Sequence, residues 1–261
     1  MKHVFFSIEQ LCNHLYLLHQ PEGVPQVEFV FIHGLQLSDA NNAWWTTWAR
    51  KGAKSKCWPK TLLVQRFPKA QVFSLSYDAS AIKPATSGKP DSYALGEKLL
   101  HSMKIAGIGQ RNRPVVFVCH SLGGLVAKQI VVTGYHHFRQ DEKVQNLLNN
   151  IRGFFFYATP HSGSKLADLC SNLPRMSPLV DHLKLINDGL GRLNSEFEKI
   201  TKLDEYKDTW KFLAVRETEV TSVVSILTLN CLRSKPPWGF LLVKLDIHLE
   251  DDMSTFSEFN Q

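Results

Sequence analysis

Short apolar runs alternate with longer amphipathic stretches along most of the chain. Runs rich in β-branched and aromatic residues predict buried strands at Val27–Ile32, Gln71–Tyr77, Val115–Val118, Ile151–Ala158, Trp210–Val215 and Phe240–Leu245. Apolar residues at helical spacing predict helices at Lys60–Phe67, Ser92–Met103 and Gly124–Thr133. This alternation is typical of a mostly parallel central sheet with helices on both faces, so we predict one α/β domain over residues 1–261.

The stretch 164–203 is helical and amphipathic, and we expect breaks at Pro174, Pro178 and Gly189. It is too long for a simple connector. Two interpretations stay open: an inserted helical cap or lid, or ordinary crossover helices that pack on the sheet. Residues Lys83–Asp91 are rich in proline and glycine and predict a surface loop.

Composition narrows the class of protein. The chain has 261 residues, of which 44% are hydrophobic and 21% charged, and this suits one globular domain without disulfide support. The cysteine count of 5 is odd and no pair has zinc-ligand spacing, which favours a reduced protein without a metal or other cofactor. No secretory signal and no membrane-spanning apolar run are present, so we expect an intracellular, non-secreted protein.

The chain is basic, with a formal net charge of +6 and a cluster formed by Arg50, Lys51, Lys54, Lys56 and Lys60. A solvated surface is the favoured interpretation, and peripheral association with anionic membranes is the alternative. No aromatic-interleaved nucleic-acid motif accompanies the cluster, so we expect no nucleic-acid partner.

The chemistry is concentrated at residues 119–123, CHSLG, between the predicted strand Val115–Val118 and the helix that follows. This segment is a variant of the G-x-S-x-G nucleophile elbow, in which a serine occupies a tight strand-to-helix turn and requires small residues around it. Gly123 matches the second glycine, and Cys119 replaces the first. We predict Ser121 as the nucleophile; Cys119, the alternative, is expected to be buried beside the turn.

An acyl-transfer site also needs an oxyanion hole, two N–H donors that bind the negative oxygen of the tetrahedral intermediate. The backbone N–H of Leu122, directly after the nucleophile, is the first predicted donor. The second is the backbone N–H of Leu35, in the His33-Gly34-Leu35 loop after the strand Val27–Ile32. We expect the side chain of His33 to order this loop.

A serine nucleophile needs a base and an acid, in the chain order serine, acid, histidine for this fold. Glu217 follows the strand Trp210–Val215 by two residues, at the strand end where ligands bind in parallel sheets. We predict Glu217 as the acid. The alternatives are Glu219 and, with less support, Asp246 and Asp168.

His248 follows the last predicted strand and is the candidate base by its position in the chain. His120 adjoins the serine, and His161 follows the strand Ile151–Ala158, where it is expected to line the pocket. His182 lies in the 164–203 stretch.

Seven motifs occur in order: FIHG at 31–34, CWPKTLL at 57–63, FP at 67–68, LSYD at 75–78, VCHSLGGL at 118–125, ATPHSGS at 158–164 and ET at 217–218. Over Val27–Thr221 the chain resembles the serine active site-containing protein family, lipase-like α/β-hydrolases related to the GPI inositol-deacylase and DUF676 groups. The resemblance implies the α/β-hydrolase fold, with the nucleophile at Ser121, the oxyanion turn at His33-Gly34 and the acid at Glu217. It also implies hydrolysis of lipid or other carboxylic esters, at mitochondria or the endoplasmic reticulum.

The resemblance ends after Thr221. Residues 222–261 are divergent, and Asp246-Ile-His248 has an extra residue between acid and base compared with the family's Asp-His pair. Two other functions therefore stay open. One is a catalytically weak scaffold with a binding or regulatory role, and the other is an acyltransferase that shares the acyl-enzyme intermediate.

Overall fold

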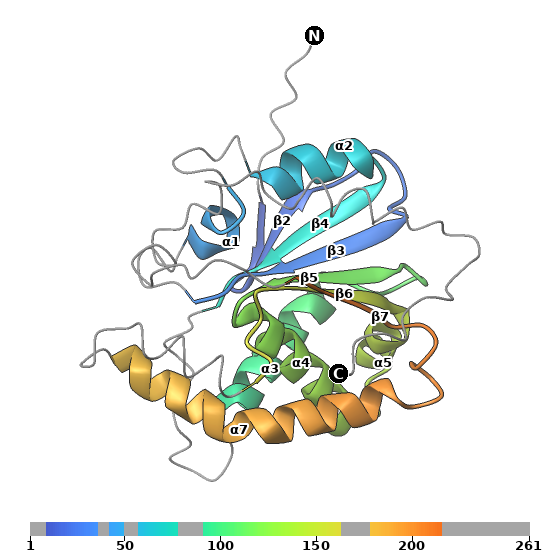
Figure 1. The fold of residues 1–261 in the computed structure, drawn as a ribbon. Helices are drawn as coiled ribbons and strands as arrows, with labels where there is room; N and C mark the ends of the chain where they lie inside the picture. The colour runs from blue at the N-terminus through green and yellow to red at the C-terminus, as the bar shows by residue number, and fades with distance from the viewer. Residues whose placement is uncertain (1–8, 36–41, 50–56, 78–90, 163–177, 216–261) are drawn as a thin grey trace.

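The described residues form a central sheet of seven strands (Figure 1). The computed structural model describes residues 9–35, 42–49, 57–77, 91–162 and 178–215. In sheet order the strands are β1 (Glu9–Cys12), β2 (Leu15–His19), β4 (Ala70–Leu75), β3 (Val27–Ile32), β5 (Val115–His120), β6 (Ile151–Tyr157) and β7 (Lys211–Val215). Strands β4 to β7 in this order are parallel, whereas β1 and β2 are antiparallel. This is the α/β-hydrolase fold predicted from the sequence.

Helices cover both faces of the sheet (Figure 1). On one face lie α1 (Ala43–Thr46), the π-helical turn η3 (Pro59–Leu63) and α2 (Val64–Arg66). On the other lie α3 (Asp91–Ile105), α4 (Gly123–His137), α5 (Glu142–Asn150) and α7 (Pro178–Thr201).

Alternate residues of the central strands enter two separate hydrophobic cores. In β3, Phe29 and Phe31 pack with Trp48 and Trp58 on the α1 face, while Val30 and Ile32 face the core shared with α3 and α4. Both sets of side chains are buried, which is why the strand is a continuous apolar run rather than an alternating one.

Most of the predicted elements are present with small changes at their ends. The strand at Val27–Ile32 has the predicted bounds, and β5 continues two residues beyond Val118 to His120. The helix after Ser121 runs to His137, four residues beyond Thr133. The helix predicted at Lys60–Phe67 is divided into η3 and α2. Phe240–Leu245 lies outside the described residues.

Four described elements were not predicted: β1, β2, α1 and α5. The two strands are short, and β1 is the edge strand of the sheet, where one side of the chain meets solvent and the apolar signal is weak. The predicted break at Gly189 is wrong, because α7 is helical throughout Pro178–Thr201. An exposed glycine costs a helix only about 1 kcal/mol, which favourable packing elsewhere on the helix outweighs.

The C-terminal part of α7 packs on the sheet as a crossover helix does. Leu190, Phe197 and Ile200 are buried in the core on the α4 face. The ring of Phe197 meets Phe154 of β6 edge-on, with 5.5 Å between ring centroids. Residues 189–201 therefore follow the crossover interpretation, and residues 163–177 of the same stretch lie outside the described part. None of the described helices is long and apolar enough to cross a bilayer.

Candidate active site

Ser121 occupies a sharp turn between β5 and α4. Its φ is 50°, in the left-handed region that non-glycine residues seldom adopt. Its backbone N–H donates a hydrogen bond of 2.8 Å to the carbonyl of Tyr157 at the end of β6. Such a strained residue persists only where its surroundings hold it, and this is commonly seen at functional sites. The structure thus contains the strand–turn–helix arrangement that the nucleophile prediction requires.

The glycine after Leu122 allows the close packing of this turn. A Cβ atom on Gly123 would lie 2.2 Å from the carbonyl oxygen of Ile32 and 2.5 Å from that of His33. Both oxygens belong to backbone, which cannot swing away as a flexible side chain can. The start of α4 therefore rests directly against the end of β3, and only glycine fits.

The loop predicted to hold the oxyanion lies beside the nucleophile. A Cβ atom on Gly34 would lie only 2.7 Å from the Cβ of Ser121. Leu122 is the N-cap residue of α4, at the helix end where N–H groups lack intrahelical acceptors and favour negative charge. The structure therefore brings Ser121, Leu122 and Gly34 together with the adjoining Leu35, and their catalytic roles remain predictions.

His33 is buried beneath this loop and is held on two sides. Its Nε2 accepts the backbone N–H of Tyr77 at 3.3 Å, so its Nδ1 carries the proton and donates to the carbonyl of Gly34 at 2.7 Å. The hydroxyl of Tyr77 donates to the carbonyl of His33 at 2.7 Å, and the two rings stack at 4.4 Å. Burial lowers the pKa of His33 to about 4, so the ring is neutral near pH 7.

This arrangement fits the expected loop-ordering role of His33. Tyr77 was not predicted as part of the site. It is the third residue of the LSYD motif at 75–78 and follows the end of β4 by two residues, at the same edge of the sheet, and that position could have predicted its role.

His120 packs among aromatic rings next to the nucleophile. Its ring lies 5.6 Å from that of Tyr157 and 6.3 Å from that of Trp48. Burial, and then the neighbouring His33, lower the pKa of His120 to about 4. The ring is therefore neutral and supports the turn. Trp48 was not predicted to lie here.

His161 follows β6 and contacts two residues that the sequence analysis did not single out. Its Nδ1 lies 3.0 Å from Nζ of Lys128 in α4, and its carbonyl accepts a hydrogen bond of 2.8 Å from the side-chain amide of Asn194 in α7. Lys128 could have been singled out from the sequence, because it is the single charged residue of the predicted helix Gly124–Thr133.

The predicted acid and base, Glu217 and His248, lie outside the described residues, as do Glu219, Asp246 and Asp168. The approach to Glu217 is described as far as Val215, the last residue of β7. The carbonyl of Val215 accepts the N–H of Ala158 at 2.8 Å, so β7 ends beside β6 at the edge where Ser121 lies. His182 falls within α7.

The alternative nucleophile, Cys119, is fully buried in the core beneath the turn. Burial raises the pKa of its thiol far above the ordinary value. Because the thiolate is the reactive form, these conditions leave Cys119 unreactive and disfavour it as the nucleophile.

Alkylation of the native protein tests this conclusion. With maleimide at pH 7.5, followed by peptide mass spectrometry, we expect Cys119 and Cys57 to stay unmodified until denaturant is added. Burial raises the pKa of Cys57 to about 12 from 9.0, which lowers its thiolate fraction about a thousandfold. The half-buried Cys12 is the internal control and should react in the native state. Modification of native Cys119 as fast as Cys12 would contradict the assignment.

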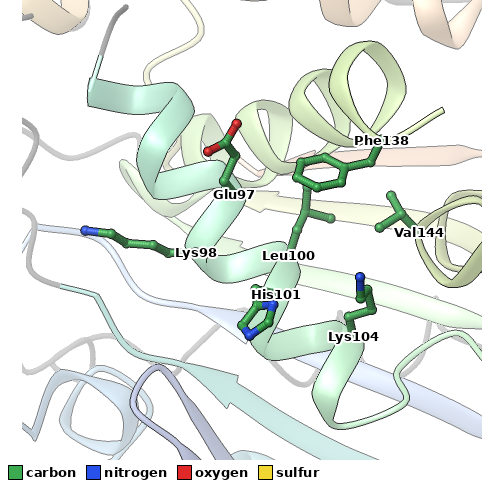
Figure 2. Close-up of a pocket in the computed structure, with 7 residues that line it drawn as sticks. All are labelled: Glu97, Lys98, Leu100, His101, Lys104, Phe138 and Val144. Carbon is green, nitrogen blue, oxygen red and sulfur yellow. The ribbon is translucent and has the colours of Figure 1, made fainter. Parts of the chain in front are cut away.

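A pocket of about 310 Å³ lies elsewhere, between α3, the end of α4 and α5 (Figure 2). Charged or titratable side chains surround an apolar floor, and the lining residues are Glu97, Lys98, Leu100, His101, Lys104, Phe138 and Val144. None of the predicted site residues belongs to it. Among the described residues no group of three or more His, Cys, Asp or Glu side chains is placed to hold a metal ion.

Known proteins similar to this chain include Protein SERAC1 of Homo sapiens, which is 27% identical over 242 residues. The match covers 84% of this chain and 35% of that protein. Protein SERAC1 of Bos taurus is 28% identical over 236 residues, 81% of this chain and 34% of that protein. The chain thus spans about a third of the length of these relatives. No family model matches the chain. The similarity agrees with the serine active site-containing resemblance, while the link to the GPI inositol-deacylase and DUF676 groups stays a prediction.

Solved structures with a similar arrangement include the lipase BlEst2 of Bacillus licheniformis, with 17% identity, a TM-score of 0.43 and coverage of 82% of this chain and 76% of that one. An inhibited esterase B from Lactobacillus rhamnosis has 14% identity and a TM-score of 0.41 over 77% of this chain and 69% of that one. MenH from S. aureus has 8% identity and a TM-score of 0.43, and the match covers 89% of this chain and 96% of that one.

Proposed function

We propose that this chain is a serine hydrolase that cleaves carboxylic esters through an acyl-enzyme on Ser121. The observation that carries the proposal is the geometry of the turn: a serine held at a φ of 50° between β5 and α4, with Gly34 packed against its Cβ. A strained serine at a helix N-terminus, beside a loop able to supply a second N–H donor, is the arrangement that acyl transfer requires.

In this proposal the Ser121 hydroxyl oxygen attacks the ester carbonyl while His248 takes the hydroxyl proton. Glu217 holds the ring of His248 in the productive tautomer. The N–H groups of Leu122 and Leu35 bind the negatively charged oxygen of the tetrahedral intermediate. The alcohol leaves with the proton from His248. Water then attacks the acyl-enzyme and gives a proton to His248, which passes it to the Ser121 oxygen as the carboxylic acid leaves.

Two features support the assignment of Glu217. The strand that precedes it ends at Val215, and β7 lies next to β6, whose Tyr157 carbonyl binds the N–H of Ser121. Glu217 follows that strand end by two residues. A lipid or acyl ester is the proposed substrate class on the strength of the sequence resemblance. Peripheral membrane association and a mitochondrial or endoplasmic reticulum location belong to the same proposal.

Covalent labelling with a fluorophosphonate probe tests the proposal. The wild-type chain is expected to form one phosphonylated adduct, which mass spectrometry locates on the peptide that contains Ser121. The Ser121→Ala variant should not label. Ser102→Ala is the matched control, because Ser102 is a buried serine of α3 whose hydroxyl donates to the carbonyl of Lys98, and it should label at the wild-type rate.

The divergence of residues 222–261 supports a second candidate function, a scaffold that uses the hydrolase fold for binding. The same experiment separates the two. If the folded wild-type chain stays unlabelled while a known serine hydrolase in the same mixture reacts, the scaffold is favoured and the hydrolase proposal fails. Labelling with product formed only in the presence of an alcohol or amine acceptor would point to acyl transfer.

A further inference from the structure

Lys128 is a buried cation in the apolar interface between α4 and α7. Its side chain is 7% exposed and lies over the rings of Phe156 and Phe197, with Nζ 5.8 and 5.5 Å from their centroids. Among the described residues, the polar partners of Nζ are Nδ1 of His161 at 3.0 Å and Oδ1 of Asn194 at 2.6 Å. No carboxylate of the described residues pairs with this ammonium, and burying an unpaired charge is costly; burial lowers the pKa of Lys128 to about 8.

The three residues contact one another, and we call them the Lys128 cluster: Lys128, His161 and Asn194. An ammonium only donates, so Nδ1 of His161 accepts and its proton lies on Nε2. The amide of Asn194 also donates to the carbonyl of His161 at 2.8 Å. The cluster thus joins α4, the segment after β6 and α7.

The segment held by the cluster, residues 157–162, lies directly against the nucleophile turn. The carbonyl of Tyr157 accepts the N–H of Ser121 at 2.8 Å, and the side chain of Thr159 fills the space beside Gly124, where a Cβ atom would come within 2.3 Å of its hydroxyl. On the other side, the N–H of Ala158 donates to the carbonyl of Val215, the strand end that leads to Glu217.

The same segment is under local strain, since Ala158 has a φ of 50° without being glycine. Strained backbone needs surrounding contacts to hold it. The Lys128 cluster supplies such contacts three residues further on, and the N–H of His161 closes the turn by donating to the carbonyl of Thr159 at 3.0 Å.

We propose that Lys128 is a positioning residue for the Ser121 turn: through His161 and Asn194 it anchors residues 157–162 between the nucleophile and the strand that carries the acid. This inference rests on the proposed hydrolase function for its catalytic consequence, but the anchoring itself does not. Lys128 acts through the segment, and its ammonium does not need to touch substrate.

The first test compares Lys128→Met, which keeps the length of the side chain and removes its hydrogen bonds, with His136→Gln. His136 also joins α4 to α7, through Glu196 at 3.1 Å, but lies at the far end of α4. In the Lys128→Met variant we expect the maximal rate of fluorophosphonate labelling to fall at least tenfold with the probe's half-saturating concentration unchanged, since positioning affects reaction more than binding. His136→Gln should label at the wild-type rate.

The second test does not depend on activity. In native-state hydrogen exchange, amides of the peptide covering residues 154–162 should exchange about tenfold faster in Lys128→Met and at the wild-type rate in His136→Gln. Unchanged exchange in folded Lys128→Met would overturn the proposal. If the wild-type chain does not label at all, the hydrolase function fails, and the exchange result alone decides whether the anchoring exists.

A pair of substitutions at His161 keeps the proposal testable if Lys128→Met does not fold. Gln at this position retains a carbonyl oxygen able to accept from Lys128, whereas Leu does not. We expect His161→Gln to keep the labelling rate and exchange protection within about threefold of wild type, and His161→Leu to lose both as Lys128→Met does. Equal behaviour of the two variants would overturn the inference.

Discussion

Ser121→Ala is expected to lower ester hydrolysis about 10³- to 10⁶-fold, to the level supported by the oxyanion donors alone. The hydroxyl oxygen is the atom that would form the acyl-enzyme, so no neighbouring group replaces it. Cys119 does not compensate, because its thiol is buried in the core. The rate of hydrolysis of a short-chain p-nitrophenyl ester measures the change. Wild type and variant are compared at equal total protein concentration, determined from ultraviolet absorbance.

Two further variants show whether the loss belongs to a catalytic unit. If Glu217 and His248 act with Ser121, adding Glu217→Ala or His248→Ala to the Ser121→Ala variant should cause little further loss, because residues that act as a unit are strongly non-additive. A large additional loss from either would mean that it acts elsewhere. Ser121→Gly is the folding control: it should be equally inactive yet about 1 kcal/mol more stable, since glycine adopts the φ of 50° without strain.

Gly123→Ala is expected to destabilise the protein by about 3 kcal/mol and to lower the rate of Ser121 labelling about 10²-fold or more. The new Cβ would lie 2.2 Å from the carbonyl oxygen of Ile32 and 2.5 Å from that of His33, so α4 and β3 must separate. That movement displaces Ser121 from the loop that contains Gly34. Chemical denaturation and the fluorophosphonate labelling rate measure the two effects.

Gly189→Ala is the matched control for this substitution. Gly189 lies in α7 with no atom within 4 Å of the position its Cβ would occupy. Alanine there should stabilise the helix by about 0.5–1 kcal/mol and leave labelling unchanged. If Gly123→Ala were as stable and as reactive as Gly189→Ala, the close packing of the turn would not be needed for function.

The strand and helix around Ser121 were predictable because their signals are local. An apolar run followed by a small-residue turn and a helical pattern needs no knowledge of distant residues, and β5 and α4 appear where the sequence places them. The strands β1 and β2 were missed for the converse reason. They are short and show little periodicity, and the pairing of β1 with β2 and of β2 with β4 forms only in the folded sheet.

The residues that support the site were harder to predict because their partners are far apart in the chain. Tyr77 lies 44 positions from His33, and Asn194 lies 66 positions from Lys128. A lone lysine in an apolar helix does not specify which carbonyl or imidazole it will meet. That information depends on how α4, β6 and α7 pack.

By itself, therefore, the sequence determined the succession of strands and helices and the turn at Ser121, since these signals are local in the chain. The tertiary structure decided how that turn is surrounded. It placed Gly34 against Ser121, buried Cys119 beneath it and fixed the tautomer of His33 through Tyr77. It also showed that residues 189–201 pack on the sheet, because an amphipathic helix specifies an apolar face but not the surface that this face will cover.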